Sequence, residues 1–362
     1  RLPCASKAGR TRRRVPRPSL SRASPPRAAQ KIARIGVVFD DKNFRVVGCF
    51  HSVWMYLRIR RSCKGRCLTA LRRVAFAEMT APMPYFTSRS DAVYFREAGR
   101  GNVAILLVHG WYQNGFQAWT TLLPYLEKKY RVFVPDLPGH GLSALGDAKN
   151  FSLERIDTLL TDFIGHIRKV YKCKKIFIAG HSYGAFAVQR LLAQDPGIVV
   201  GAVALAAIDD YAPYTRRLKN VLAIPRWFIS TYYRLLALFA LFPYGDRMLL
   251  YANTEPALLP GRLAYGKIKN KTLSPLASHA YMRAFLRARV PWPEKKIRTP
   301  LLLVYGERDA LTSSKWAQQI TPHVQQATTV VVPNAGHNVQ ISGAREVAAA
   351  MHRFFEKCFR HH

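Results

Sequence analysis

The sequence predicts an α/β fold, with a mostly parallel central sheet, helices on both faces and a helical cap insertion. Three observations support this prediction. Short apolar runs typical of strands alternate with helical segments from Tyr85 to the end of the chain. The run Val103–Val108 is apolar throughout, as expected for a strand buried on both faces of a sheet. One stretch, residues 209–296, holds no clear strand and interrupts the alternation.

The elements are expected in strict order after an opening hairpin with strands at residues 85–87 and 92–96. The predicted strands that follow are 103–108, 131–135, 175–179, 199–206, 301–305 and 328–332. The predicted helices between and after them are 116–129, 152–171, 183–194, 314–323 and 344–357. Crossovers between parallel strands are right-handed, so a ligand is expected beyond the carboxyl ends of these strands.

The first 78 residues have a different composition from the rest. Residues 1–78 carry 20 Lys or Arg and three acids, whereas the whole 362-residue chain carries 56 Lys or Arg and 21 acids, a net charge of +35. Residues 1–30 are rich in Arg, Pro and Ser and contain no acid, so they bury too little apolar surface to offset the entropy of ordering. We expect residues 1–78 to be a basic, disordered leader, or upstream sequence before a start at Met79. An organelle-targeting peptide and a basic tail for nucleic acid are the alternatives.

Two features bear on location and on metal binding. The apolar run at residues 46–59 spans 14 residues, shorter than the ~20 that a membrane-spanning helix needs. Cys63 and Cys67 have no second pair of ligands at metal-binding spacing, so no metal site is expected. Cys173 and Cys358 are isolated in the main body, which favours a reducing compartment, and we expect a cytoplasmic protein.

The insertion at residues 209–296 is predicted to be a helical cap over an active site, between two core segments at residues 79–208 and 297–362. Residues 221–242 are apolar almost throughout, but Pro225, Arg226 and Arg234 argue against a membrane-embedded hairpin. A lid that inserts partly into a lipid surface is intermediate between a cap over the active site and a membrane-embedded hairpin. Together with the excess of basic residues, it predicts peripheral contact with an anionic membrane surface. Nucleic acid is not expected as a partner.

The strongest local signal is the sequence Gly180-His181-Ser182-Tyr183-Gly184. It matches G-x-S-x-G and lies directly between a predicted strand and a predicted helix, the context of a nucleophile elbow. Gly180 and Gly184 are expected because larger side chains would collide with neighbouring backbone at so sharp a turn. The turn raises the Ser182 hydroxyl above the sheet, which makes Ser182 the candidate nucleophile.

A serine hydroxyl needs a base, and the base needs an acid that fixes its tautomer. His337 lies just after the last predicted strand, on the same rim of the sheet as Ser182. His166 and His352 lie within predicted helices, and His361 and His362 are terminal. Asp309 follows the strand that begins at Leu301 and precedes His337 by one helix and one strand. The sequence therefore predicts His337 as the base and Asp309 as the acid. The competing acids are Glu307, Asp209 and Asp210.

Two backbone N–H groups are candidates for stabilising an oxyanion. Tyr183 begins the helix after Ser182, and Trp111 lies in the loop after the strand Val103–Val108. His109, in the same loop, is expected to pack and form hydrogen bonds beneath it. His140, within the turn sequence Asp-Leu-Pro-Gly-His-Gly, is likewise expected to be structural.

In chain order, the sequence carries the motifs HGW, DLPGHG, GHSYG, GERD and AGHN. This set resembles the α/β-hydrolase superfamily, especially the cap-bearing serine hydrolase branch that includes small-molecule esterases, meta-cleavage-product hydrolases and lipase-like enzymes. The likeness covers residues 85–357. It implies that Ser182 is acylated, that His337 shuttles the proton and that Asp309 holds His337. It also implies that Trp111 and Tyr183 supply the oxyanion N–H groups.

The resemblance also narrows the chemistry. Dehalogenases and epoxide hydrolases of this superfamily carry Asp at the nucleophile position, so Ser182 argues against both. Tyr183 departs from the Met that is frequent there, which weakens a haloperoxidase-like interpretation. Neither a metal nor an organic cofactor is required by these motifs.

We expect hydrolysis of an ester or similar acyl bond of a hydrophobic small molecule through an acyl-enzyme intermediate. The hydrophobic substrate is inferred from the aromatic side chains of the predicted cap. Three alternatives stay open: a carbon–carbon bond hydrolase, an acyltransferase with the same three residues, and a non-catalytic binding protein on this fold.

Overall fold

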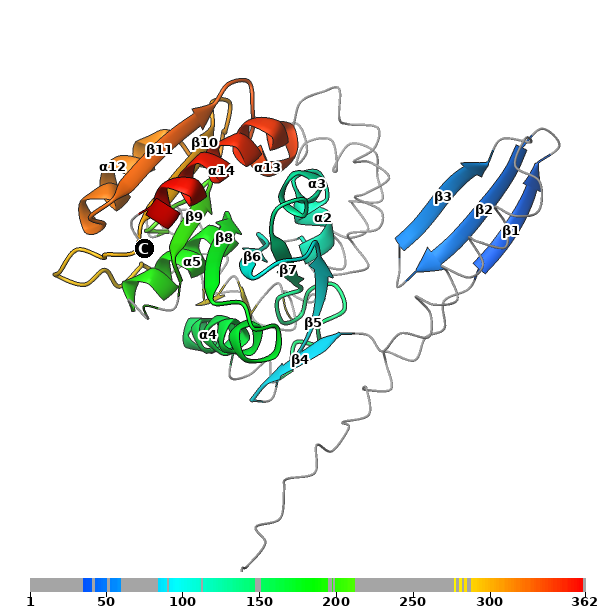
Figure 1. The fold of residues 1–362 in the computed structure, drawn as a ribbon, viewed down its shortest axis with the longest axis horizontal. Helices are drawn as coiled ribbons and strands as arrows, with labels where there is room; N and C mark the ends of the chain where they lie inside the picture. Colours follow the sequence, from blue (N-terminus) through cyan, green and yellow to red (C-terminus); the bar gives the residue numbers. More distant parts are fainter. Residues whose placement is uncertain are drawn as a thin grey trace, which may run out of the picture.

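The structure is a computed structural model that describes two parts of the chain (Figure 1). In the first part it describes residues 35–40, 43–50 and 53–59. In the main body it describes residues 84–89, 91–111, 113–146, 151–194, 197, 199–211, 277, 280–281, 283–284 and 288–360.

An eight-stranded sheet forms the centre of the main body, with the strand order β11-β10-β9-β8-β6-β7-β5-β4. The parallel strands are β6 (Val103–Val108), β7 (Arg131–Pro135), β8 (Lys175–His181), β9 (Gly201–Leu205), β10 (Leu301–Gly306) and β11 (Ala327–Val332). The hairpin β4 (Tyr85–Ser88) and β5 (Asp91–Ala98) adds antiparallel strands beside β7. The chain passes from β6 to β7 on one side and then crosses to β8 on the other. This change of direction is where ligands bind in open α/β sheets.

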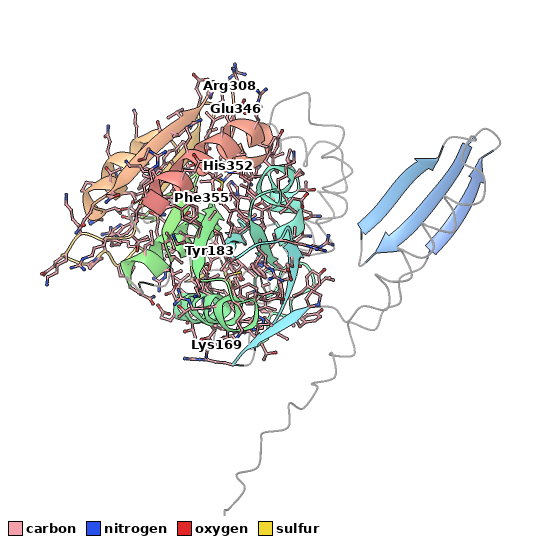
Figure 2. All side chains as sticks on the ribbon, in the orientation of Figure 1. Lys169, Tyr183, Arg308, Glu346, His352 and Phe355 are labelled. Carbon is pink, nitrogen blue, oxygen red and sulfur yellow. The ribbon has the colours of Figure 1, made fainter. Side chains whose placement is uncertain are left out.

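Helices cover both faces of the sheet and bury two hydrophobic clusters. On one face, α4 (Leu153–Val170) and α5 (Tyr183–Ala193) pack over a cluster that includes Leu106 of β6. On the other, α2 (Gly115–Trp119), α3 (Leu123–Leu126) and α14 (Ala344–Arg360) pack over Ile105 and Leu107. Alternate residues of one apolar strand therefore serve opposite cores, as the uninterrupted apolar run predicted. On α14, Phe355 packs against Phe177 of β8, with ring centroids 4.0 Å apart (Figure 2).

The predicted α/β fold is confirmed, and most elements differ from prediction only at their ends. The helix predicted at 116–129 is instead the short pair α2 and α3. Pro124 lies in the first turn of α3, where its missing backbone N–H costs no helical hydrogen bond. A helix that came from residue 116 could not continue through it, because proline lacks that N–H and its ring collides with the preceding turn. The segment predicted at 314–323 is helical as η3 (Ser314–Trp316), α12 (Ala317–Ile320) and η4 (Thr321–His323), and Pro322 lies at the start of η4. The short helix α13 (Val339–Ser342) was not predicted.

The chain before the main body contains β1 (Ile35–Asp40), β2 (Asn43–Phe50) and β3 (Val53–Ile59), which pair as an antiparallel sheet. No strand was expected in this region from the sequence. The pairs Asp40–Asn43 and Phe50–Val53 leave two residues at each reversal of the chain, the spacing of a tight hairpin. The apolar run at 46–59 thus contains the end of β2 and the whole of β3. The assignment of residues 1–78 to a separate leader remains a prediction.

Most of the predicted cap lies outside the described residues, including the apolar stretch 221–242. Within its C-terminal part, Ala277 and Tyr281 are buried against the core. The Tyr281 ring contacts His140 at 4.8 Å and Tyr183 at 5.1 Å between centroids. Among the described helices, none has both the length and the apolar character needed to cross a bilayer.

The aromatic core under α4 predicts a large stability effect at Phe163. This ring is buried and makes edge contacts with Phe86 and Phe95, at 5.0 and 5.1 Å between centroids. Phe163→Ala should lower the free energy of unfolding by about 3–5 kcal/mol because it leaves a cavity. Tyr125→Ala, at a side chain that is 41% exposed, is the control and should change it by less than about 0.5 kcal/mol. Urea titration of both variants measures the difference, and equal midpoints would contradict this account of the core.

Candidate active site

Three sequence-predicted side chains lie after the carboxyl ends of different strands. Ser182 follows β8 directly, Asp309 follows β10 by three residues, and His337 follows β11 by five. Because these strands are parallel, their carboxyl ends share one edge of the sheet. Residues far apart in sequence are thereby brought into one hydrogen-bonded series.

The turn that carries Ser182 is strained, and its two glycines permit it. Ser182 has a φ of 52° and a ψ of −113°, in a region that L-residues rarely adopt, at a cost of roughly 1–3 kcal/mol. A Cβ at Gly180 would lie 2.2 Å from the carbonyl oxygen of Gly184, and a Cβ at Gly184 would lie 2.2 Å from that of Val108. The Ser182 N–H donates to Leu205 O at 2.9 Å, which ties the turn to β9.

His337 is buried with its ring between the other two side chains. Its Nε2 lies 3.1 Å from Ser182 Oγ, and its Nδ1 lies 2.9 Å from Asp309 Oδ2. The loops after β10 and β11 are closely joined, because the Arg308 N–H donates to Ala335 O at 2.8 Å. A carboxylate only accepts, so Nδ1 carries the proton and the Nε2 lone pair faces the serine hydroxyl. This arrangement allows His337 to remove the hydroxyl proton.

Asp309 is held as an ionised carboxylate. Its Oδ1 accepts the N–H groups of Leu311 at 2.8 Å and Thr312 at 2.9 Å, and its Oδ2 also accepts the Thr312 hydroxyl. Burial alone would raise the pKa of this carboxyl, but the hydrogen bonds from His337 and Thr312 outweigh burial and hold the pKa below its ordinary value. Thr312 was not predicted; its position three residues after an Asp is the local signal for such a contact.

The competing acids have other partners. Glu307 is exposed and accepts the Asn334 N–H at 2.9 Å. Asp209 accepts the Trp292 indole N–H at 3.3 Å, and Asp210 pairs with Arg289 at 3.0 Å. Of the candidate acids, Asp309 is the one whose carboxylate contacts His337.

The two predicted oxyanion donors follow neighbouring strands of the sheet, β8 and β6. Tyr183 is the first residue of α5, where backbone N–H groups have no acceptor within the helix. Trp111 follows β6, and β6 is the neighbour of β8 in the sheet. The N–H of Gly110, the residue before Trp111, donates to Gln113 Oε1 at 3.2 Å.

His109 and His140 are structural, as predicted. His109 is fully buried, its Nε2 accepts the Leu137 N–H at 2.9 Å and its Nδ1–H donates to Gly110 O at 2.8 Å. Burial lowers the pKa of His109 to about 4 and that of His140 well below its ordinary value. Both rings are therefore neutral at neutral pH. No cluster of metal-ligating side chains occurs among the described residues.

Comparison with known proteins agrees with this fold. The family profile described as "Alpha/beta hydrolase family" matches residues 105–350, more than half of the chain. The chain therefore belongs to the alpha/beta hydrolase family.

Two curated relatives cover the chain to different extents. A dihydrolipoyllysine-residue acetyltransferase component of an acetoin cleaving system from Pseudomonas putida is 26% identical over 73% of this chain and 66% of its own length. A pimeloyl-[acyl-carrier protein] methyl ester esterase from Legionella pneumophila (strain Corby) is 31% identical over 30% of this chain and 38% of its own. The chain thus spans less than two thirds of the length of either relative.

Solved structures show the same fold at low sequence identity. Epoxide hydrolase I from potato (Solanum tuberosum) superimposes with a TM-score of 0.61 at 19% identity, over 76% of this chain and 99% of that one. At this identity the likeness concerns the fold alone.

The buried acid Asp136 makes stability depend on pH. Its carboxylate accepts the N–H groups of Gly115 and Leu142, yet burial raises its pKa from 3.8 to about 6. The folded protein thus binds this proton more tightly than the unfolded chain, so the free energy of unfolding falls as pH rises through this window. The loss reaches about 3 kcal/mol for a shift of this size.

The Asp136→Asn variant cannot ionise and should lack this loss. Relative to Asp136→Asn, the wild type should lose up to about 3 kcal/mol of unfolding free energy between about pH 4 and about pH 7. Urea titrations at both pH values measure this change. Glu294→Gln, at an exposed acid, is the control and should show no such change. A difference between wild type and Asp136→Asn that is equal at both pH values would contradict the assignment.

Proposed function

We propose that this protein is a serine hydrolase that cleaves an ester or similar acyl bond of a hydrophobic small molecule through an acyl-enzyme intermediate. One observation carries the proposal: the hydrogen-bonded series from Ser182 Oγ through the His337 ring to Asp309 Oδ2, at 3.1 and 2.9 Å. A hydroxyl, an imidazole and a carboxylate in this order are the parts required to activate a serine.

In the proposed first step, Ser182 Oγ attacks the acyl carbonyl carbon while His337 Nε2 takes the hydroxyl proton. The resulting imidazolium is stabilised by the Asp309 carboxylate. The tetrahedral intermediate then collapses, the bond to the leaving alcohol breaks, and the alcohol takes the proton from His337 Nε2. In the second step, water gives a proton to His337 Nε2 as its oxygen attacks the acyl carbon. The bond from that carbon to Ser182 Oγ then breaks, Oγ takes the proton back from His337 Nε2, and the acid is released.

The oxyanion of each tetrahedral intermediate needs donors that are already in place. We assign this role to the backbone N–H groups of Tyr183 and Trp111. The position of Tyr183 at the start of α5 supports the first assignment, because the helix dipole also favours negative charge there. The position of Trp111 in the loop after β6, the strand next to β8, supports the second assignment. Such a donor contributes about 2.7–4 kcal/mol to transition-state stabilisation.

A hydrophobic acyl group is the substrate class that the sequence and the described residues favour. The cap proposed for residues 209–296 is rich in aromatic side chains. Its described part brings Tyr281 against Tyr183, next to the nucleophile. The Legionella relative is named as a methyl ester esterase, which agrees with ester cleavage. We also propose that the cap contacts an anionic membrane surface and that the protein is cytoplasmic.

Acyl transfer is the second candidate, favoured by the name of the Pseudomonas relative, an acetyltransferase component. The same acyl-enzyme would then be attacked by an alcohol, amine or thiol in place of water. Product analysis with and without an added acceptor separates the two reactions. Epoxide hydrolysis is not proposed, because Ser182 stands at the position of the Asp nucleophile that the epoxide hydrolases of this superfamily carry.

A panel of p-nitrophenyl esters with short and long acyl chains tests the proposed function. The wild type should hydrolyse them with a preference for the longer apolar chains. Ser182→Ala should lower kcat by about 10⁴- to 10⁶-fold, because it removes the nucleophile. A variant as active as the wild type would end the proposed mechanism, and a preference for charged, polar substrates would end the proposed substrate class.

The Thr312 hydroxyl should affect kcat through its hydrogen bond to the Asp309 carboxylate. Thr312→Val keeps the shape but removes a donor to the Asp309 carboxylate. Loss of a hydrogen bond to a charged group, about 1.5–3 kcal/mol, should lower kcat at least about tenfold with little change in KM. Thr158→Val, at an exposed hydroxyl on α4, should have wild-type kcat. Equal kcat in both variants would show that Thr312 does not support Asp309.

A further inference from the structure

A second histidine adjoins Ser182, and the proposed mechanism leaves it without a role. His181 is 2% exposed, and its ring centroid lies 5.0 Å from that of His337. His181 Nε2 lies 2.9 Å from the backbone carbonyl oxygen of His337. Because a carbonyl oxygen only accepts, Nε2 carries a proton and donates it. The residue before the nucleophile is thus bonded directly to the main chain of the base.

The His181 ring is neutral. Burial, together with the neighbouring His337 ring, lowers the pKa of His181 to about 3. At neutral pH it therefore has one N–H, on Nε2, and no charge. In the proposed reaction His337 becomes an imidazolium, and a neutral neighbour does not oppose that charge as a second imidazolium would.

Gln113 extends the contact to the loop after β6. Its Nε2–H donates to Asn338 Oδ1 at 2.7 Å, and its Oε1 accepts the Gly110 N–H at 3.2 Å. The same Oε1 lies 3.3 Å from His181 Nδ1, and because both atoms are acceptors in this tautomer, they are in contact without a hydrogen bond. Gln113 is therefore joined to the site through its bonds to Gly110 and to Asn338, the residue after His337. A Cβ at Gly110 would lie 2.9 Å from His181 Nδ1, so a glycine there lets the loop approach the ring. His181 and Gln113 therefore touch the loops that follow β6, β8 and β11.

We infer that His181 is a positioning residue: its Nε2–H holds the His337 main chain so that the base stays within reach of Ser182, and Gln113 couples this arrangement to the loop that carries Trp111. This inference rests on the proposed function. The His337 carbonyl belongs to the residue that must place Nε2 3.1 Å from Ser182 Oγ. A displacement of about 1 Å at such a site costs about 10²-fold in rate.

A matched pair of variants separates positioning from packing. His181→Gln has an amide N–H that reaches where the imidazole Nε2–H reaches, whereas His181→Met has nearly the same shape and no donor. His181→Met should lower kcat by about 10- to 100-fold with KM little changed. His181→Gln should stay within about threefold of wild type. Ester hydrolysis and the rate of fluorophosphonate labelling of Ser182 are measured for both variants, beside thermal unfolding.

Equal losses in the Gln and Met variants, or no loss in either, would overturn the inference. If His181→Met does not fold, Gln113→Met replaces it and should also lower kcat with KM little changed. A wild-type kcat in Gln113→Met would overturn the inferred coupling between Gln113 and the base.

An NMR measurement tests the inference without activity. The proton on His337 Nδ1, which bonds to Asp309, gives a strongly downfield signal. It should be retained in His181→Gln and be shifted or lost in His181→Met. An unchanged signal in His181→Met would overturn the inference. A wild type that neither hydrolyses esters nor reacts with fluorophosphonate would defeat the proposed function, and the NMR comparison would still decide the role of His181.

Discussion

The sharp turn between β8 and α5 is the constraint on which the site depends. Ser182 occupies a backbone conformation with a φ of 52°, unfavourable for any residue with a side chain. The turn persists because Gly180 and Gly184 let the backbone segments meet, and because the Ser182 N–H is bonded to β9. Packing on both faces of the sheet stabilises the strands that hold this turn in place.

The same edge of the sheet brings the other groups to Ser182. In the strand order, β9 lies between β8 and β10, and both β9 and β10 lie between β8 and β11, so the loops that carry Asp309 and His337 extend toward the nucleophile. Around His337, the charged and neutral groups are set by their surroundings. Asp309 is kept ionised by donors, whereas burial keeps the rings of His109 and His181 neutral. An imidazolium formed at His337 thus faces a carboxylate and no buried cation among the neighbours described.

Much of this arrangement was predictable from sequence, because local rules govern it. The buried strand Val103–Val108 and the glycine pattern around Ser182 are each set by nearby residues. Predictions failed where a single residue broke a periodic pattern, as Pro124 does between α2 and α3. The contacts of His181 with Gln113 and His337 join residues 68 and 156 positions apart. Hydrophobic periodicity does not predict contacts between residues so far apart in sequence, because they form only when the sheet is assembled.

The account's central claim is that Ser182 forms a covalent bond to the acyl group. The most direct measurement is peptide mapping by mass spectrometry of protein quenched in acid after brief exposure to a p-nitrophenyl ester. The account predicts an acyl group on the peptide that contains Ser182, at the residue itself. Ester cleavage with the acyl group on another residue, or with no adduct under conditions where acylation outpaces deacylation, would contradict it.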